Sequence, residues 1–231
     1  MSYTLHYAPD NASLIIRLAL EHRGLPYRTH LVDRAAAEQS LPAYRKLNPN
    51  GQIPVLVTPQ GPIFETGAIL LWLADTHGGL GPAAQDPTRG DFLKWLFWLS
   101  NTLHPALRML FYPDKYIAAD AAPALHTGLI KHLTTCYATL NAVAADQPGW
   151  INANAPTVLD FYTCALMRWP ALYPTHTAHN WFTTLPLPAL RDICTRIEAL
   201  PCTAALQKAE GLGTEPFSTP RPPNPPIGSA T

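Results

Sequence analysis

The order of secondary-structure elements in the first third of the chain constrains the fold most. Bulky side chains alternate with small or polar ones over Tyr3–Tyr7, which predicts a strand, and a run of Leu, Ile and Ala over Ser13–Arg23 predicts a helix that stops at Gly24. A second strand is predicted over Tyr27–Val32. Strand, helix and strand in so short a segment imply a right-handed crossover and parallel pairing.

The next segment adds an antiparallel hairpin. Turn residues over 46–51 precede a third strand at Gln52–Val57, and Pro54 stands at its entrance. Proline cannot donate to a strand ladder, so it belongs at an edge, a strand start or a bend, with a cis bond before it as one option. Gly61–Pro62 then makes a tight connection to a strand at Ile63–Phe64, so the two strands must be antiparallel, and a helix is predicted over Glu65–Thr76.

No convincing strand signal returns after the glycine-rich segment that begins at Gly78. Helices are expected over Arg89–Leu110, Ala121–Ala145, Thr157–Trp169 and Pro188–Leu200, with a short one after Pro201 and an irregular interval over 170–187. The fold class is therefore an α/β N-terminal domain followed by an all-α C-terminal domain. We expect the first domain at residues 1–78, a linker at 79–88, the helical domain at 89–213 and a tail at 214–231.

The proline-rich tail contains one aromatic residue, Phe217. Such a composition favours a flexible segment that is disordered or wrapped loosely over the body, and a proline-rich ligand for a partner domain is the alternative.

Composition excludes several functions. Lys+Arg 16 and Asp+Glu 16 cancel, so no positive field attracts nucleic acid or anionic lipid. The richest apolar run, Phe92–Leu99, contains Lys94 and is much shorter than the ~20 residues that cross a bilayer. The first ten residues lack the pattern of a secretory signal, so the cytoplasm is the expected location. Charged residues make up 14%, below the ~25% of typical domains, which favours an oligomer that hides surface.

Cysteine and histidine usage favours neither disulfides nor a metal. The four cysteines are unevenly spaced and without a Cys-x-x-Cys pair, so buried structural thiols are expected. His176 and His179 have the spacing of helical metal ligands, but Pro174 and the Thr-rich surroundings make that geometry poor. No metal cofactor is predicted.

An ordered set of motifs resembles the glutathione transferase family over roughly residues 1–210. The motifs are a Tyr-x-Pro turn at 7–9, Asn-Pro-x-Gly-Gln-Ile-Pro-Val-Leu at 48–56, Glu-Thr-x-Ala-Ile at 65–69 and Ala-Pro-Thr-Val-Leu-Asp-Phe at 155–161. The resemblance implies a thioredoxin-like N-terminal domain, glutathione as co-substrate, a cytoplasmic homodimer and a glutathione S-transferase activity in detoxification.

The second and third motifs have a physical rationale as a glutathione site. With a cis bond before Pro54, Ile53 offers its backbone N–H and C=O to an extended peptide, which docks like an added strand. Glu65 and Thr66 stand at a helix start, where free N–H groups attract a carboxylate and the Glu side chain receives an ammonium group. Gln52 adds an amide contact. The alternative for Glu65 and Thr66 is an ordinary helix start.

A transferase must also stabilise the glutathione thiolate, because a free thiol has a pKa of ~8.5. The N-terminus of the first helix is the available positive element, and Ser13 and Asn11 are the candidate catalytic donors, with Tyr7 a further one. Ser13 has a helix-capping alternative and Tyr7 a packing alternative. The turn at 7–14 is similar to that of the bacterial beta class, but Ala12 faces the position of that class's cysteine, which excludes a mixed disulfide with the enzyme.

The resemblance implies that a hydrophobic electrophile binds against the helical domain. The residues implied as its pocket are Tyr7, His104, Phe111 and Tyr112, with Tyr116 beside them, and interhelical core is the alternative. Thr157 and Asp160 have the spacing of a capping box, so Asp160 is assigned a folding role.

Three functions remain open. The first is a glutathione transferase that activates the thiolate for attack on a small hydrophobic electrophile. The second is a glutathione-dependent isomerase, dehalogenase or lyase on the same fold. The third is a non-catalytic, glutathione-binding or transferase-like dimeric protein, which the absence of a cysteine at Ala12 motivates.

Overall fold

The computed structural model describes residues 2–152, 154–175 and 179–230, and its N-terminal part is built on a four-stranded mixed sheet. The strand order is β2-β1-β3-β4. β1 (Tyr3–Tyr7) pairs in parallel with β2 (Tyr27–Leu31) and antiparallel with β3 (Val55–Thr58), which pairs antiparallel with β4 (Gly61–Phe64). The predicted parallel pairing of the first two strands and the predicted antiparallel hairpin are both confirmed.

Helices cover this sheet. α1 (Ser13–His22) and α3 (Thr66–His77) contact each other, and short helical turns at Glu38–Ser40 and α2 (Pro42–Arg45) lie between β2 and β3. α1 is buried over most of its length because it also packs on helices of the C-terminal part. This double contact explains why its sequence is apolar around most of its circumference.

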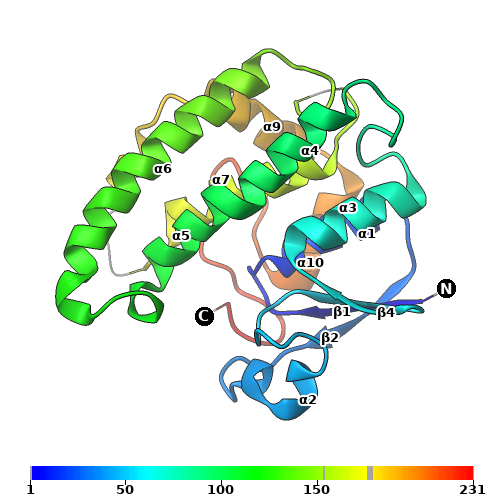
Figure 1. Cartoon of the computed structure of the whole chain (residues 1–231), viewed down its shortest axis with the longest axis horizontal. Coiled ribbons are helices and arrows are strands. Elements are labelled where there is room, and N and C mark those ends of the chain that lie inside the picture. The colour runs from blue at the N-terminus through cyan, green and yellow to red at the C-terminus, as the bar shows by residue number, and fades with distance from the viewer. Residues whose placement is uncertain (1, 153, 176–178, 231) are drawn as a thin grey trace.

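The C-terminal part is all-helical in the described residues, as predicted. Its helices are α4 (Arg89–Trp98), α5 (His104–Phe111), α6 (Ala122–Ala145), α7 (Val158–Leu172), α8 (Asn180–Thr183), α9 (Pro188–Glu198) and α10 (Pro201–Glu210), with 3-10 turns at Pro113–Lys115 and Ala119–Ala121. In Figure 1, α4, α6, α7 and α9 group on one side of the molecule and the strands lie on the other.

Two prolines explain two departures of the helices from the predicted bounds; a third is α8, which lies inside the interval predicted as irregular. The single helix expected over 89–110 contains a π-helical turn at Leu99–Leu103, just before Pro105, whose ring would clash with the carbonyl of residue 101 in a regular helix. α7 continues through Pro170 to Leu172, although an irregular segment was predicted from 170. Pro170 leaves the carbonyl of Leu166 without its helical donor, and the Tyr137 hydroxyl donates to that carbonyl instead.

The predicted capping box at the start of α7 is confirmed. The Thr157 hydroxyl accepts from the backbone N–H of Leu159 (3.2 Å), and the Asp160 carboxylate accepts from the backbone N–H of Thr157 (2.8 Å) and of Asn152 (2.7 Å). Burial raises the pKa of Asp160 to about 6. All four cysteines are buried and free. No helix among the described residues is long and apolar enough to span a membrane.

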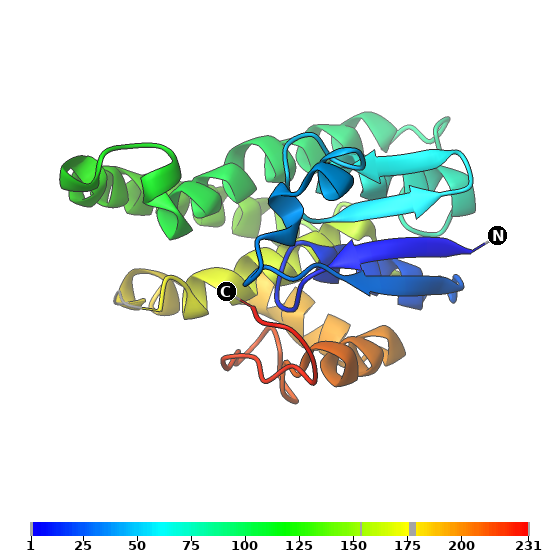
Figure 2. The same ribbon diagram turned by 90° about the horizontal axis from the view of Figure 1, so that it is seen from below.

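Of the two forms expected for the tail, the structure has it wrapped over the body, and described residues of 214–230 pack there. Phe217 is only 2% exposed, and its backbone N–H donates to the Glu198 carboxylate (2.6 Å). The buried Arg168 donates to the carbonyls of Pro216 (2.8 Å) and Arg221 (3.0 Å). A proline-rich segment has few backbone N–H groups of its own, so its carbonyls must find donors elsewhere. Here the buried guanidinium of Arg168 supplies those donors. The tail ends beside the N-terminal domain (Figures 1 and 2).

This packing predicts that Phe217 anchors the tail. Phe217→Ala should lower the free energy of unfolding by about 3–5 kcal/mol, the usual cost of emptying a buried aromatic site. Ile227→Ala, at a tail residue that is 58% exposed, is the matched control and should change it by less than ~0.5 kcal/mol. Urea unfolding followed by circular dichroism measures both variants. Equal, small effects would show that the tail contributes nothing to stability.

Candidate functional site

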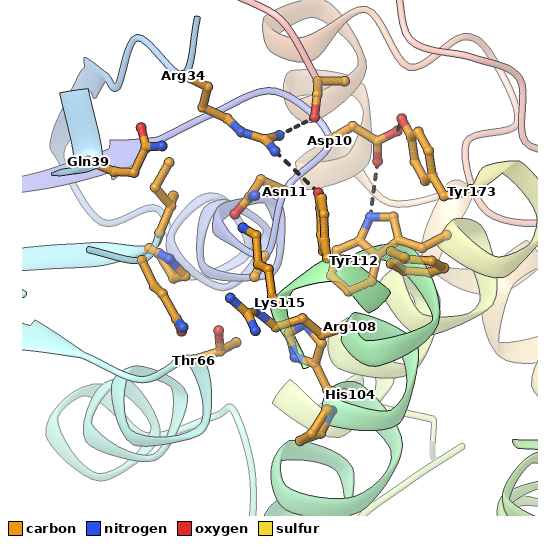
Figure 3. A pocket seen from close by; sticks show the side chains of 18 of the residues that line it. Asp10, Asn11, Arg34, Gln39, Thr66, His104, Arg108, Tyr112, Lys115 and Tyr173 are labelled. Atoms are coloured by element: carbon orange, nitrogen blue, oxygen red, sulfur yellow. Dashed lines mark hydrogen bonds between the residues drawn. The ribbon is translucent and has the colours of Figure 1, made fainter. Parts of the chain in front are cut away.

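A cavity of about 540 Å³ lies where the N-terminal domain meets the helical domain, within the usual size of small-ligand sites. Four N-terminal segments line it: the turn before α1, the segment after β2 that carries Arg34 and Gln39, the chain around Pro54, and the start of α3. The opposite wall comes from α5, the turn after it, and the C-terminal end of α7 (Figure 3).

The chain around Pro54 lies at the base of the cavity. The Ile53–Pro54 bond is cis, and the strand ladder begins only at Val55, so the backbone of Ile53 lies outside the sheet. The carbonyl of Gln52 accepts from the Tyr44 hydroxyl (2.9 Å) and from the Asn48 amide (2.8 Å). Gln52, Ile53 and Pro54 all line the cavity, and these hydrogen bonds fix the segment that carries them.

The start of α3 forms the adjoining wall. Glu65 precedes the helix with φ 71°, a left-handed conformation that is uncommon for a non-glycine residue and recurs at ligand clamps. Its side chain is exposed at the cavity, whereas Thr66 is nearly buried as the first helical residue. A carboxylate beside a helix N-terminus can hold an ammonium and a carboxylate group together, as an α-amino acid presents them.

The structure separates the two candidate catalytic donors. Asn11 lines the cavity, and its Oδ1 is buried without a hydrogen-bond partner among the described residues. Ser13 is fully buried and does not line the cavity: its hydroxyl donates to the carbonyl of Ala8 (3.1 Å) and accepts from the N–H of Ala8 (3.4 Å). The prediction that Ser13 contacts the thiol is therefore corrected, because its hydroxyl closes the turn before α1.

Tyr7 is also corrected as a pocket residue. It is 4% exposed and absent from the cavity wall, and the Arg17 guanidinium lies 4.7 Å from its ring centroid. As the last residue of β1, Tyr7 alternates with Leu5 and Tyr3 on the buried face of the sheet. Its side chain belongs to the core, which was the alternative interpretation.

Asp10, which sequence reasoning missed, connects this turn to the rest of the protein. Its carboxylate accepts from Arg168 Nε (2.8 Å) and Nη2 (2.9 Å), from Trp169 Nε1 (3.1 Å) and from the Tyr173 hydroxyl (2.7 Å). Its backbone N–H donates to the Glu210 carboxylate (2.9 Å). Asp10 has φ 49°, so the turn that presents Asn11 and Ala12 is held in an unusual conformation by α7 and α10.

The helical wall is aromatic and basic. His104, Phe111 and Tyr112 line the cavity, as expected from the sequence, together with Tyr116. His104 Nδ1 lies 2.7 Å from the Tyr162 hydroxyl, and burial, with a smaller electrostatic effect of Arg108, lowers the pKa of His104 to about 4. His104 is therefore neutral at physiological pH.

Three basic residues of the cavity were not predicted: Arg34, Arg108 and Lys115. Arg34 donates to the Tyr112 hydroxyl (3.2 Å) and to the carbonyl of Ala230 in the tail. No group of three or more His, Cys, Asp or Glu that would hold a metal occurs among the described residues. His176, one of the two histidines considered as metal ligands, lies outside those residues.

Comparisons with known proteins agree with this architecture. The family model described as "Glutathione S-transferase, N-terminal domain" matches residues 12–76. Glutathione S-transferase GST-4.5 of Xanthomonas campestris pv. campestris is 30% identical over 212 residues, 90% of this chain and 98% of that protein. Disulfide-bond oxidoreductase YfcG of Escherichia coli K12 is 29% identical over 91% of this chain and 97% of its own length.

Solved structures give the same result. A sphingomonad glutathione S-transferase complexed with glutathione has a TM-score of 0.72 at 28% identity, covering 91% of this chain and all of that one (100%). A Burkholderia graminis glutathione transferase with two glutathione molecules bound per subunit has a TM-score of 0.76 at 24% identity, covering 92% of this chain and 90% of that one. The sheet, the helical domain and the cavity between them thus define a two-domain protein of the thioredoxin-like transferase class. The chain belongs to the glutathione transferase family.

The environment of His104 predicts a pH-dependent stability. The folded protein holds the imidazole neutral down to about pH 4, whereas the unfolded chain binds a proton near the ordinary value of 6.5. Stability is therefore lost as the pH falls from 6.5 towards 4. When the pH is lowered from 7 to about 5, protonation of His104 in the unfolded chain should reduce the free energy of unfolding by at most about 2 kcal/mol.

His104→Gln tests this, since the amide can still hydrogen-bond the Tyr162 hydroxyl but does not titrate. Urea unfolding at both pH values should show a smaller loss in the variant than in the wild type. If the two proteins lose equal stability, the imidazole is not held neutral by the fold.

Proposed function

We propose that this protein is a glutathione transferase that lowers the pKa of the glutathione thiol and directs the sulfur at a small hydrophobic electrophile. One observation carries the proposal: the amide of Asn11 lies beside the N-terminus of α1, in the same cavity as Glu65 and Thr66. That arrangement offers a donor for a thiolate next to a clamp for an amino acid head group.

The tripeptide fits the cavity in one direction. The γ-glutamyl ammonium meets Glu65, and its carboxylate meets the N-terminus of α3 at Thr66. The cysteinyl backbone runs along Ile53, as an added strand would, with Gln52 further on. The glycine carboxylate then points towards Gln39 and Arg34, which line the far end of this wall.

The chain's own groups then stabilise the thiolate. The Asn11 amide N–H donates to the sulfur, and the first N–H groups of α1 add a positive potential. Ala12 supplies no thiol, so the attacking sulfur is that of glutathione. The sulfur lone pair forms the new C–S bond while the electrophile's leaving group departs with its electron pair. Neutral His104 and the aromatic wall exclude water from the electrophile.

A second candidate is glutathione-dependent disulfide reduction. It is favoured by the similarity to YfcG, named a disulfide-bond oxidoreductase, along 91% of this chain. Here the same thiolate attacks a disulfide sulfur, forming a new S–S bond while the other sulfur leaves as a thiolate. An isomerase or lyase on this fold, and a binder that has lost activation, are the remaining alternatives.

We further propose a cytoplasmic homodimer with a role in detoxification, as the family resemblance implies. The low content of charged residues (14%) and the half-exposed Phe97 on α4 support a covered surface. Sedimentation equilibrium of the full chain tests the dimer directly.

The assignment of Asn11 predicts a specific loss of thiolate. In Asn11→Ala the pKa of bound glutathione should rise by about 1 unit or more, the worth of a charge-assisted hydrogen bond. In Ser13→Ala the thiolate should remain, because the Ser13 hydroxyl bonds only to Ala8. The difference absorbance of the bound thiolate, followed against pH, measures both variants.

S-methylglutathione, which has no thiol to ionise, provides the control for folding and binding, and both variants should bind it. If glutathione binds but neither the wild type nor any variant shows a thiolate near neutral pH, the protein is a binder. If Ser13→Ala alone removes the thiolate, the assignment of Asn11 is wrong.

The clamp at Glu65 predicts a ligand-specific loss of affinity. Glu65→Gln should weaken S-methylglutathione binding roughly tenfold, because it removes the carboxylate partner of the ammonium group. The affinity of an analogue that lacks the α-amino group should not change on the same substitution. The comparison isolates the contact between the Glu65 carboxylate and the ammonium group, as a double-mutant cycle does. Isothermal titration calorimetry measures all four affinities, and equal losses for the two ligands would refute the clamp.

A further inference from the structure

We propose that the second substrate of this site carries a carboxylate on a flat aromatic or disulfide-bearing body, and that Arg108 and Lys115 bind this carboxylate. The inference rests on the proposed function, because it concerns the partner of glutathione in the same cavity. The carboxylate would bind at the helical wall, which the proposed glutathione molecule does not contact.

Arg108 and Lys115 are held in place but not neutralised. The Arg108 guanidinium lies 5.4 Å from the ring centroid of Tyr116 and donates to that residue's hydroxyl. The Lys115 ammonium lies 4.7 Å from the ring centroid of Tyr112. Among the described residues neither cation forms an ion pair. Cation–π contacts orient a cation without cancelling its charge.

The other charges of the cavity are already accounted for. The Asp10 carboxylate pairs with the fully buried Arg168. Glu65 lies on the opposite, N-terminal wall, where the γ-glutamyl ammonium needs it, and Arg34 lies at the glycine end. The positive charges of Arg108 and Lys115 on the helical wall therefore remain for a ligand other than the glutathione molecule that binds along Ile53 and Glu65.

The direction of these side chains supports the assignment. In Figure 3, Arg108 and Lys115 extend from the helical wall towards the side of the cavity where Asn11 and Thr66 lie. A carboxylate bound to them places the rest of a substrate between the aromatic wall and the thiolate site. Arg108 is half-buried, and its planar fork matches a carboxylate with two parallel hydrogen bonds.

Two sources could supply this carboxylate: an aromatic acid that is also an electrophile, or a second glutathione unit in a disulfide. Both reactions balance without a further reactant. With a chlorodinitrobenzoate, the glutathione sulfur bonds to the carbon that carries chlorine, and chloride leaves with the electron pair. With glutathione disulfide, the new S–S bond forms as the other sulfur leaves as a thiolate.

A matched substrate pair tests the charge preference. A chlorodinitrobenzoate and its benzamide differ by one negative charge, and each enzymatic kcat/KM is divided by the uncatalysed rate with glutathione. The wild type should prefer the benzoate roughly tenfold or more, as expected for a charge-assisted contact. The Arg108→Gln/Lys115→Gln double variant should lose most of this preference, and added salt should reduce it in the wild type.

Lys131→Gln, at an exposed position on α6, is the control that removes one positive charge away from the cavity. It should leave the benzoate-to-benzamide ratio unchanged. An equal ratio in the wild type and in the double variant would overturn the proposal.

Binding measurements separate this proposal from the proposed function. Dinitrobenzoate and dinitrobenzamide lack chlorine, so their affinities in the presence of S-methylglutathione need no thiolate and no turnover. If the protein shows no thiolate, the transferase proposal fails, but a preference for dinitrobenzoate that the double variant loses still supports the charged wall. If instead the double variant binds glutathione disulfide more weakly but dinitrobenzoate with unchanged affinity, the carboxylate that Arg108 and Lys115 bind is that of a second tripeptide. No loss for either ligand overturns the inference.

Discussion

The buried ion pair between Asp10 and Arg168 is the interaction on which the site depends. Both side chains are inaccessible to solvent, and the Asp10 carboxylate accepts four hydrogen bonds, two of them from Arg168. Removing one partner of such a pair typically costs about 3–5 kcal/mol, because the other charge stays buried. The pair fixes the turn before α1 in a left-handed conformation at Asp10. The position of the Asn11 amide is thus set by α7, a helix that lies some 150 residues later in the sequence.

The same network ties three distant segments together. Arg168 also donates to two tail carbonyls, at Pro216 and Arg221. Glu210, at the end of α10, accepts from the Asp10 N–H and from Arg17 of α1 (2.9 Å), while burial raises the pKa of Glu210 to about 7. The turn that carries Asn11, the helical core and the tail therefore share their buried charges. A change in any one of them alters the electrostatic environment of the other two, because the interior screens charges weakly.

The sequence was sufficient for the fold and for one wall of the cavity, since local patterns encode both. β1 has the predicted bounds, and Ile53, Pro54, Glu65 and Thr66 line the cavity because they lie at a strand entrance and a helix start. Whether Ser13 or Asn11 faces the cavity could not be predicted, because neighbouring positions of one turn differ only in where their side chains point. The sequence did not indicate that Arg108 and Lys115 line the cavity either, because a single basic residue in a helical segment has the same pattern as a solvent-exposed one. Tail packing depends on Arg168, a contact between distant residues.

In the proposed reaction Ala12 offers no thiol, so the reacting sulfur belongs to the ligand rather than to the enzyme. A cysteine in this position could hold glutathione covalently, whereas an amide and a helix N-terminus can only stabilise its thiolate. The proposed clamp at Glu65 would then position the tripeptide by an end that lies far from its sulfur. In these proposals charge orients both reactants: Glu65 holds the ammonium end of glutathione at the N-terminal wall, and Arg108 and Lys115 hold the carboxylate of its partner at the helical wall.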